Sequence, residues 1–137
     1  MMTINKYRVN SLIPIATKII LEEKFKDSKG QFLKETSKPK TYKGYISSFN
    51  ANCIIMTPLA TTIMYNSSKG SNEDKSIVIK WIYQILKKEN ESFTNENDLI
   101  GYIEANSVNG KLKTDALVNI LTAGSALKLA FRKFKLI

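Results

Sequence analysis

The stretch KSIVIKWIYQILKK, residues 75–88, indicates most clearly what kind of fold this chain adopts. Its apolar side chains recur at helical spacing along one face: Ile77, Val78, Trp81, Ile82, Ile85 and Leu86. Lys87 and Lys88 follow in the last turn, where positive charge complements the helix dipole. Ser71, with Asp74 three residues later, resembles a capping box and predicts the start of this helix. We expect Trp81 to lie in the core.

Helical spacing recurs on both sides of this stretch. Residues 4–26 predict a first helix, whose regular part would begin near Pro14 with Ser11 as the cap. Thr57 followed by Pro58 marks a kink or a fresh helix start within residues 42–65. Further helices are predicted over residues 95–105 and from Lys113 or Thr114 to residue 137, with a basic loop at residues 27–41. No segment shows the alternation of a strand, so we predict an all-α fold: a compact single-domain bundle of five to six helices covering residues 1–137.

The segment from residue 44 to residue 68 contains 25 consecutive residues without charge. It is too polar to cross a bilayer, which needs about 20 predominantly apolar residues. We therefore expect a helix or helix pair buried at the centre of the bundle. Cys53, the only cysteine, is expected to be a small buried hydrophobe, and an unpaired cysteine suits a reducing cytoplasm. The first residues show no secretory pattern, so a cytoplasmic location is predicted.

The composition excludes several kinds of catalytic site. The chain has 137 residues, no histidine and one cysteine, which excludes Ser-His-Asp and Cys-His pairs, a histidine-based zinc site and a disulfide framework. Glu22, Glu23 and Lys24 form an E-x-K string like that of some metal-dependent nucleases, but those enzymes need a further carboxylate on a strand. We expect a protein that is not an enzyme and uses no cofactor or metal.

Positive charge is concentrated toward the two ends of the sequence. The formal net charge is +9, of which residues 1–45 contribute +6, residues 46–108 contribute −2 and residues 109–137 contribute +5. Such a balance suits a polyanionic partner, either nucleic acid or an anionic membrane surface.

Two sets of basic residues are candidates for contacting nucleic acid. In the last predicted helix, Lys128, Arg132 and Lys135 are spaced so that their side chains cluster on one face, with Lys133 nearby. Like charges at this spacing destabilise a helix slightly, which favours an external anion over a merely solvated face. The second set lies in and after the basic loop, around Tyr42, where it would bind phosphates and stack a base or serve only solubility. It consists of Lys34, Lys38, Lys40 and Lys43.

Two segments carry a resemblance to a known family. They are KGYISSFNANCIIMTPLATTIMY, residues 43–65, and ALKLAFRKFK, residues 126–135. With the helix around Trp81, they resemble the small subunit of the Cmr complex, the type III-B CRISPR effector. The matching positions are Pro58, Leu59, Ile63, Met64 and Tyr65 in the first segment, and Ala126, Leu127, Lys128, Leu129, Ala130 and Arg132 in the second. Pro58 replaces a glycine of the family and Met64 an alanine, which affects the expected packing of that helix.

The resemblance implies a non-catalytic role in antiviral defence. Members of this family stack in more than one copy along a helical ribonucleoprotein, beside the backbone and large subunits, and help hold target RNA paired with CRISPR RNA. Copies stacking head to tail need two different complementary patches, and residues 46–108 are a candidate for part of one.

Three alternatives remain at the level of sequence. The first is the small subunit of the related Csm complex. The second is a free-standing basic helical nucleic-acid-binding regulator, although a lysine-rich last helix with Arg132 alone suits base reading poorly. The third is a metal-dependent enzyme that relies on carboxylates.

Overall fold

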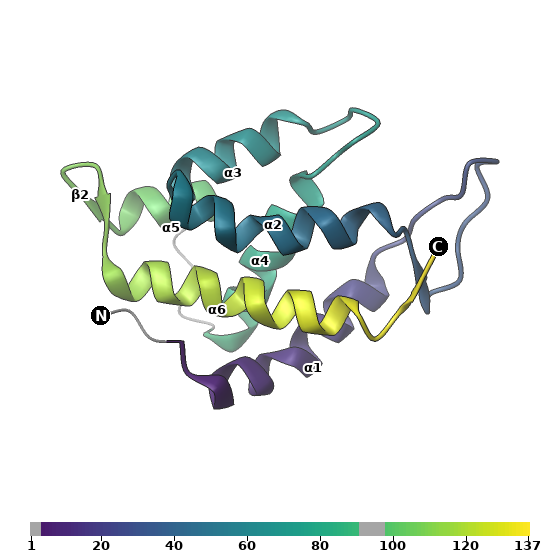
Figure 1. The fold of residues 1–137 in the computed structure, drawn as a ribbon, viewed down its shortest axis with the longest axis horizontal. Coiled ribbons are helices and arrows are strands. Elements are labelled where there is room, and N and C mark those ends of the chain that lie inside the picture. The colour runs from purple at the N-terminus through teal and green to yellow at the C-terminus, as the bar shows by residue number, and fades with distance from the viewer. Residues whose placement is uncertain (1–3, 91–97) are drawn as a thin grey trace.

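A computed structural model describes residues 4–90 and 98–137 and confirms the predicted all-α bundle. The helices in these residues are α1 (Lys6–Glu22), α2 (Thr41–Ile55), α3 (Pro58–Ser67), α4 (Ser76–Glu89), α5 (Leu99–Ala105) and α6 (Thr114–Phe131). Four two-residue strands accompany them: β1 (Ser37–Lys38), β2 (Ser107–Val108), β3 (Lys111–Leu112) and β4 (Lys135–Leu136). In Figure 1, α1 and α3 form opposite edges of the molecule, and α2, α4 and α6 lie between them.

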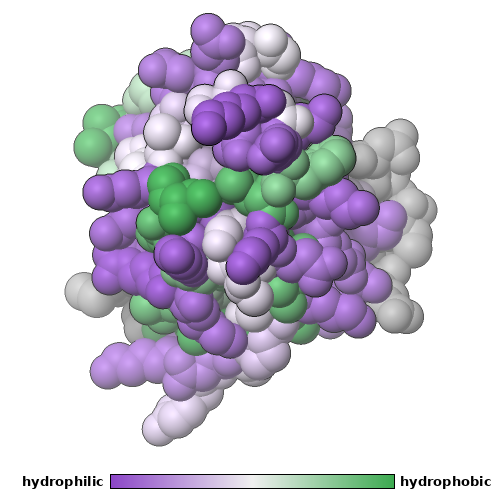
Figure 2. Space-filling view, turned by 90° about the vertical axis from the view of Figure 1, so that its right-hand side faces the viewer, coloured by the Kyte–Doolittle hydropathy of each residue, from purple (hydrophilic) through white to green (hydrophobic). Residues whose placement is uncertain are grey.

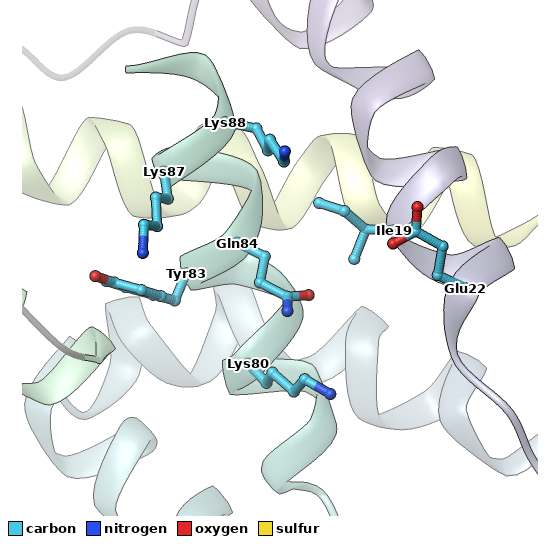
Figure 3. Close-up of a pocket in the computed structure, with 7 residues that line it drawn as sticks. All are labelled: Ile19, Glu22, Lys80, Tyr83, Gln84, Lys87 and Lys88. Carbon is cyan, nitrogen blue, oxygen red and sulfur yellow. The ribbon is translucent and has the colours of Figure 1, made fainter. Parts of the chain in front are cut away.

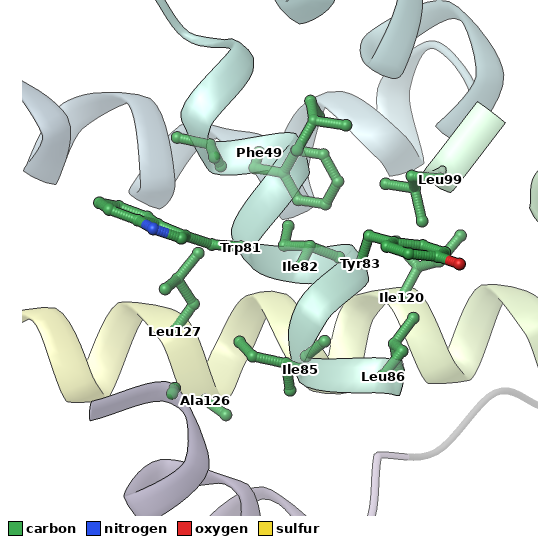
Figure 4. Close-up of a cluster of buried hydrophobic side chains, with 14 of the residues drawn as sticks. Phe49, Trp81, Ile82, Tyr83, Ile85, Leu86, Leu99, Ile120, Ala126 and Leu127 are labelled. Atoms are coloured by element: carbon green, nitrogen blue, oxygen red, sulfur yellow. The ribbon is translucent and has the colours of Figure 1, made fainter. Parts of the chain in front are cut away.

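Helix α4 lies at the centre of the bundle, because its apolar face is buried against helices on several sides. It packs against α1, α3 and α6. Trp81 is completely buried, as predicted, and its ring lies 6.1 Å from the ring centroids of Phe25, Tyr42 and Phe131. Figure 4 shows the side chains of α4 between Phe49 of α2 and residues of α6. The periodicity of residues 75–88 thus identified most of the buried apolar face of α4, including Val78, Ile82, Ile85 and Leu86.

The uncharged segment of residues 44–68 is not buried at the centre, and that prediction is wrong. It forms most of α2 and α3, which bury one face each, with Phe49 and Cys53 inward. Ile55 is 79% exposed and Met64 is 55% exposed. The absence of charge permits burial but does not require it. In this bundle α4 already fills the centre, so α2 and α3 each keep one face exposed. The described residues contain no helix with the length and hydropathy that crossing a membrane requires.

Capping side chains explain where several helices begin. Thr57 caps α3, its hydroxyl accepting from the Ala60 amide at 3.0 Å, and Pro58 follows at the first helical position. The alternative of a fresh helix start after Thr57 is therefore confirmed. Asp98 caps α5 in the same way, through the Gly101 amide at 2.8 Å. The expected start of this helix at residue 95 lies outside the described residues.

Two predicted helix starts are wrong. Helix α1 begins at Lys6 rather than near Pro14, because the Asn5 side chain accepts from the amides of Tyr7 and Arg8 and caps an earlier turn. Pro14 lies inside the helix, where the burial of residues before and after it keeps the helix continuous. Ser71 does not cap α4, which begins five residues later.

The last helix ends at Phe131, so the prediction that it continues to residue 137 is also wrong. The chain turns and β4 then runs parallel to β1, with Ser37 opposite Lys135. This pairing supplies backbone hydrogen bonds to both segments and lets Phe134 pack near Phe131. The region predicted as a plain loop is likewise partly ordered, since Lys26 pairs with Phe32 across a turn in which Gly30 has a φ of 80°.

Candidate nucleic-acid interface

Most of the basic residues predicted to bind nucleic acid lie together at one end of the molecule. We call this region, formed by residues 24–43 and 132–137, the basic end. It is where α1 and α6 finish and where α2 begins (Figure 1). Its sequence contains ten lysine and arginine residues but only two acidic residues, Asp27 and Glu35. The excess charge makes this end the first candidate for an anion-binding surface.

The parallel pairing of β1 with β4 joins the two candidate sets. The Lys135 amide donates to the Thr36 carbonyl at 3.0 Å, and the Ile137 amide donates to the Lys38 carbonyl at 3.1 Å. The Lys40 amide then donates to the Ile137 carbonyl at 2.8 Å. The sequence alone suggests two separate surfaces, because no local pattern indicates a pairing between two-residue strands so far apart in the chain.

The basic side chains other than Lys38 are exposed and lack acidic partners. The ion pairs among the described residues are Arg8 with Glu89 and Lys80 with Glu23, neither of which involves this set. Apart from Lys38, the one member of the predicted set whose side chain hydrogen-bonds to another described residue is Lys133, which donates from Nζ to Thr17 Oγ1 at 3.2 Å. The exposed members of the predicted set are Lys34, Lys40, Lys43, Lys128, Arg132, Lys133 and Lys135. Their charges are therefore not neutralised by acidic side chains in the described part of the chain.

The predicted row of Lys128, Arg132 and Lys135 on a single helical face does not form. Lys128 lies in the last turn of α6, Arg132 follows that helix as its C-cap, and Lys135 belongs to β4. The row fails because the helix ends at Phe131, before both Arg132 and Lys135. Lys135 lies instead beside β1 and the lysines of the N-terminal half.

Lys38 is not available to an external phosphate, so its assignment to the binding set is wrong. Its side chain is only 1% exposed, and Nζ donates to the Glu23 carbonyl at 2.7 Å. The ammonium group also lies 5.6 Å from the ring centroids of both Phe25 and Phe134. Burial lowers the pKa of Lys38 because it removes water from the charged form. Lys38 therefore connects β1 with the end of α1 and with the C-terminal segment.

Tyr42 serves mainly as a packing residue rather than as an exposed stacking platform. Its ring is half-buried, with its centroid 5.0 Å from that of Phe25 and 5.5 Å from that of Tyr45. Burial raises the pKa of Tyr42 to about 12, so its hydroxyl stays neutral. Figure 2 views the basic end face on and shows hydrophilic side chains over most of it, around a smaller apolar area.

A second surface with several lysines lies between α1 and α4, and sequence reasoning did not single it out. This groove of about 630 Å³ is lined by Lys80, Lys87 and Lys88 from α4 and by Ile19 and Glu22 from α1 (Figure 3). Glu22 thus adds a negative charge to the groove, and Lys80 is paired with Glu23 at 3.1 Å. The adjacent lysines of α4 were a visible signal for it, but its mixed charge makes it a weaker anion site than the basic end.

Two further observations concern the identity of the protein. Within residues 4–90 and 98–137, no three His, Cys, Asp or Glu side chains lie together in a way that would hold a metal ion. Comparison of the chain with protein-family models, with curated proteins and with solved structures gives no match. The charge and geometry of the basic end are therefore what the structure contributes to a functional assignment.

Proposed function

We propose that this chain is a non-catalytic RNA-binding subunit, which holds an RNA strand by its phosphates through the basic end. The observation that carries the proposal is the β1–β4 pairing, because it places Lys40 and Lys43 on the same end of the molecule as Arg132 and Lys135. A phosphate backbone is a line of regularly spaced charges, and a continuous set of unpaired cations is suited to follow it.

The chemistry of this surface favours contacts that do not depend on base sequence. Base edges are read mainly by guanidinium and amide side chains, whereas lysine predominates in the basic end and Arg132 is its only arginine. Lysine ammonium groups act as point charges toward phosphate oxygens. A subunit that follows RNA of arbitrary sequence needs contacts of this kind.

The side chains available for chemistry support a non-catalytic role. The chain has no histidine. Cys53 is buried beside α3, and burial raises the pKa of its thiol to about 12, which keeps it protonated and unreactive. Bond breaking in the assembly would then belong to other subunits.

The narrower proposal is that the assembly is a type III-B CRISPR ribonucleoprotein, in which copies of this chain stack beside the backbone and large subunits. It rests on the resemblance of residues 43–65 and 126–135 to the Cmr small subunit. The two departures from the family are compatible with the fold. Pro58 occupies the first position of α3, where proline is favoured, and Met64 is mostly exposed, so neither side chain disturbs the core.

The RNA contacts are tested by the salt dependence of binding. We would measure the affinity of the full chain, and of the complex purified with it, for an RNA strand and an RNA duplex at several salt concentrations. The variant replaces five exposed residues of the basic end with Gln: Lys34, Lys40, Lys43, Arg132 and Lys135. Each lost phosphate contact should reduce the slope of log K against log salt by roughly 0.7 to 0.9.

A matched variant controls for the change in net charge. It replaces five exposed lysines outside the basic end with Gln: Lys6, Lys69, Lys87, Lys88 and Lys113. We expect this variant to keep most of the wild-type slope. Equal losses in the two variants, or no change in the first, would reject the basic end as the contact surface. A strong preference for one DNA duplex would favour the regulator instead, and purification without CRISPR RNA or backbone subunits would reject the type III-B assignment.

A further inference from the structure

An exposed aromatic residue, Phe32, lies within the basic end. Its side chain is 66% exposed, whereas Tyr42, around which the sequence predicts base stacking, is half-buried. In Figure 1 the segment between α1 and β1, which contains Phe32, extends away from the helices at the right-hand edge of the molecule. Single exposed apolar residues are common on proteins, so the function of this ring depends on how the chain holds it and on what lies near it.

A short hairpin at residues 25–33 fixes the direction of the Phe32 side chain. Lys26 pairs with Phe32 in antiparallel orientation, and the Leu33 amide donates to the Phe25 carbonyl at 2.7 Å. Successive side chains of extended backbone point to opposite faces, so Phe25 and Phe32 lie on opposite faces of the hairpin. Phe25 packs into the core, with its ring centroid 6.1 Å from that of Trp81. Phe32 therefore faces solvent because its neighbour on the other face anchors the hairpin.

Asp27 closes the turn of this hairpin. Its Oδ1 atom accepts from the amides of Lys29 and Gln31, both at 2.9 Å, and Gly30 occupies the position that needs a positive φ. These contacts hold the hairpin in place before any ligand binds, which lowers the entropy lost on binding. They also engage the carboxylate of Asp27, one of the two acidic residues of the basic end.

Lysines flank Phe32 on both sides. Lys26 Nζ lies 5.0 Å from the centroid of the Phe32 ring, and Lys24, Lys29 and Lys34 are exposed on the same segment. A ligand of this ring must therefore offer a flat apolar face and carry negative charge beside it. A nucleobase next to its own phosphate meets both requirements, and stacking on an aromatic side chain tolerates any base.

An anionic membrane carries the same sign of charge but fits this surface less well. The structure describes every residue of the basic end, and the large hydrophobic side chains exposed there are Phe32 and Ile137. Membrane binding strengthens with the apolar area that enters the bilayer, and two side chains supply little of it. Stacking needs only one ring, so the observations favour a base.

We propose that Phe32 is a stacking platform for an unpaired base of the RNA strand that the basic end holds. The inference rests on the proposed RNA contacts and not on the type III-B assignment. The base must be unpaired, because bases inside a duplex stack on one another and leave no face for the ring. The contact thus suits a single strand or a base turned out of a duplex. It adds affinity without adding a phosphate contact.

Binding of the full chain to labelled single-stranded RNA of mixed sequence, followed by fluorescence anisotropy, tests the proposal. Phe32→Ala should raise the Kd about 5- to 100-fold, as expected for the loss of one stacked base. Phe32→Tyr should stay close to wild type, because it keeps the ring. The slope of log K against log salt should be the same in all three proteins, since no phosphate contact changes. The matched control is Tyr7→Ala, which removes an exposed aromatic of α1 outside the basic end and should leave the Kd unchanged.

A strand without bases separates stacking from charge. An abasic strand of the same length keeps its phosphates, so wild type and Phe32→Ala should bind it equally well. A loss of affinity that is as large for the abasic strand would make Phe32 a structural support of the phosphate-binding surface and would overturn the stacking proposal.

The outcomes also distinguish this inference from the proposed function. Equal binding of base-bearing RNA by wild type and Phe32→Ala, with the expected salt slope, would overturn stacking and leave the RNA-binding role intact. A wild-type chain that binds no RNA would reject both. Binding to vesicles of phosphatidylserine and phosphatidylcholine that depends on Phe32, without binding to RNA, would likewise reject both and identify a membrane surface as the ligand.

Discussion

Asn50 of α2 lies directly against Gly124 of α6, at a point where the two helices approach closely. The Asn50 side chain donates from Nδ2 to the Leu121 carbonyl at 3.0 Å and to Ser125 Oγ at 3.1 Å. A Cβ atom added to Gly124 would overlap Asn50 Oδ1, which is buried and has no hydrogen-bond partner among the described residues. The absence of a side chain at Gly124 is therefore what admits the asparagine.

Replacing Gly124 with alanine should destabilise the protein despite the better helix propensity of alanine. We expect a loss of about 1–3 kcal/mol in the free energy of unfolding, typical of overpacking, measured by chemical denaturation. Gly44→Ala is the control: Gly44 also lies in a helix, but a Cβ there meets nothing, so stability should be unchanged or increase by up to about 1 kcal/mol. The double change Asn50→Ala with Gly124→Ala should cost less than the sum of the single changes. Strict additivity would show that the two residues do not interact.

Lys38 should be replaceable by an apolar residue of similar length without loss of RNA binding. Lys38→Met keeps the packing between Phe25 and Phe134 and removes a buried charge, so we expect a free energy of unfolding within about 1 kcal/mol of wild type at neutral pH. Lys38→Ala leaves a cavity and should cost about 2 kcal/mol or more. Both variants should retain the wild-type salt slope, whereas a flattened slope in the Met variant would make Lys38 a phosphate contact after all.

The same residue gives the stability of the protein a definite pH dependence. Burial lowers the pKa of Lys38 below its ordinary value of 10.5, so the unfolded chain binds more protons than the folded chain as that value is approached. Stability conferred through Lys38 therefore rises with pH in the alkaline range below 10.5 and is lost as the pH falls. Denaturation at neutral and alkaline pH should show wild type gaining stability relative to Lys38→Met. A constant difference would contradict this.

The C-terminal strand should position charges other than its own. Lys135→Gln removes one charge and should reduce the salt slope of RNA binding by roughly 0.7 to 0.9. A chain ending at Lys133 also loses the backbone partners of Thr36, Lys38 and Lys40, so its slope should fall by at least twice as much. Its helix content by circular dichroism should stay close to that of wild type. Equal slopes for the two variants would mean that β4 contributes only the charge of Lys135.

The cap of α3 should contribute measurably to stability. Thr57→Ala removes the hydroxyl that accepts from the Ala60 amide and should lower the free energy of unfolding by about 1 kcal/mol. Thr41→Ala, at the start of α2 where no side chain caps the helix, should change it by less than about 0.5 kcal/mol. Similar values for both would argue against a capping role for Thr57.

Local patterns predicted most of the helices but not all of their limits. The apolar spacing around Trp81 and the cap at Thr57 both concern residues within a few positions of each other, so they were visible in the sequence. The limits that failed depended on competing contacts. Asn5 capped α1 six residues before Ser11 would have, and the strand pairing of Lys135 replaced the last turn of the predicted helix.

The sequence by itself determined the helical class, the buried face of α4 and the concentration of positive charge toward both ends of the chain. These properties follow from composition and from interactions within single helical turns. Only the tertiary structure decided that β4 joins the two basic segments, that Lys38 is buried and that the uncharged α2–α3 segment lies exposed. Each of these depends on the free energy of contacts between residues far apart in the chain, which no local pattern specifies.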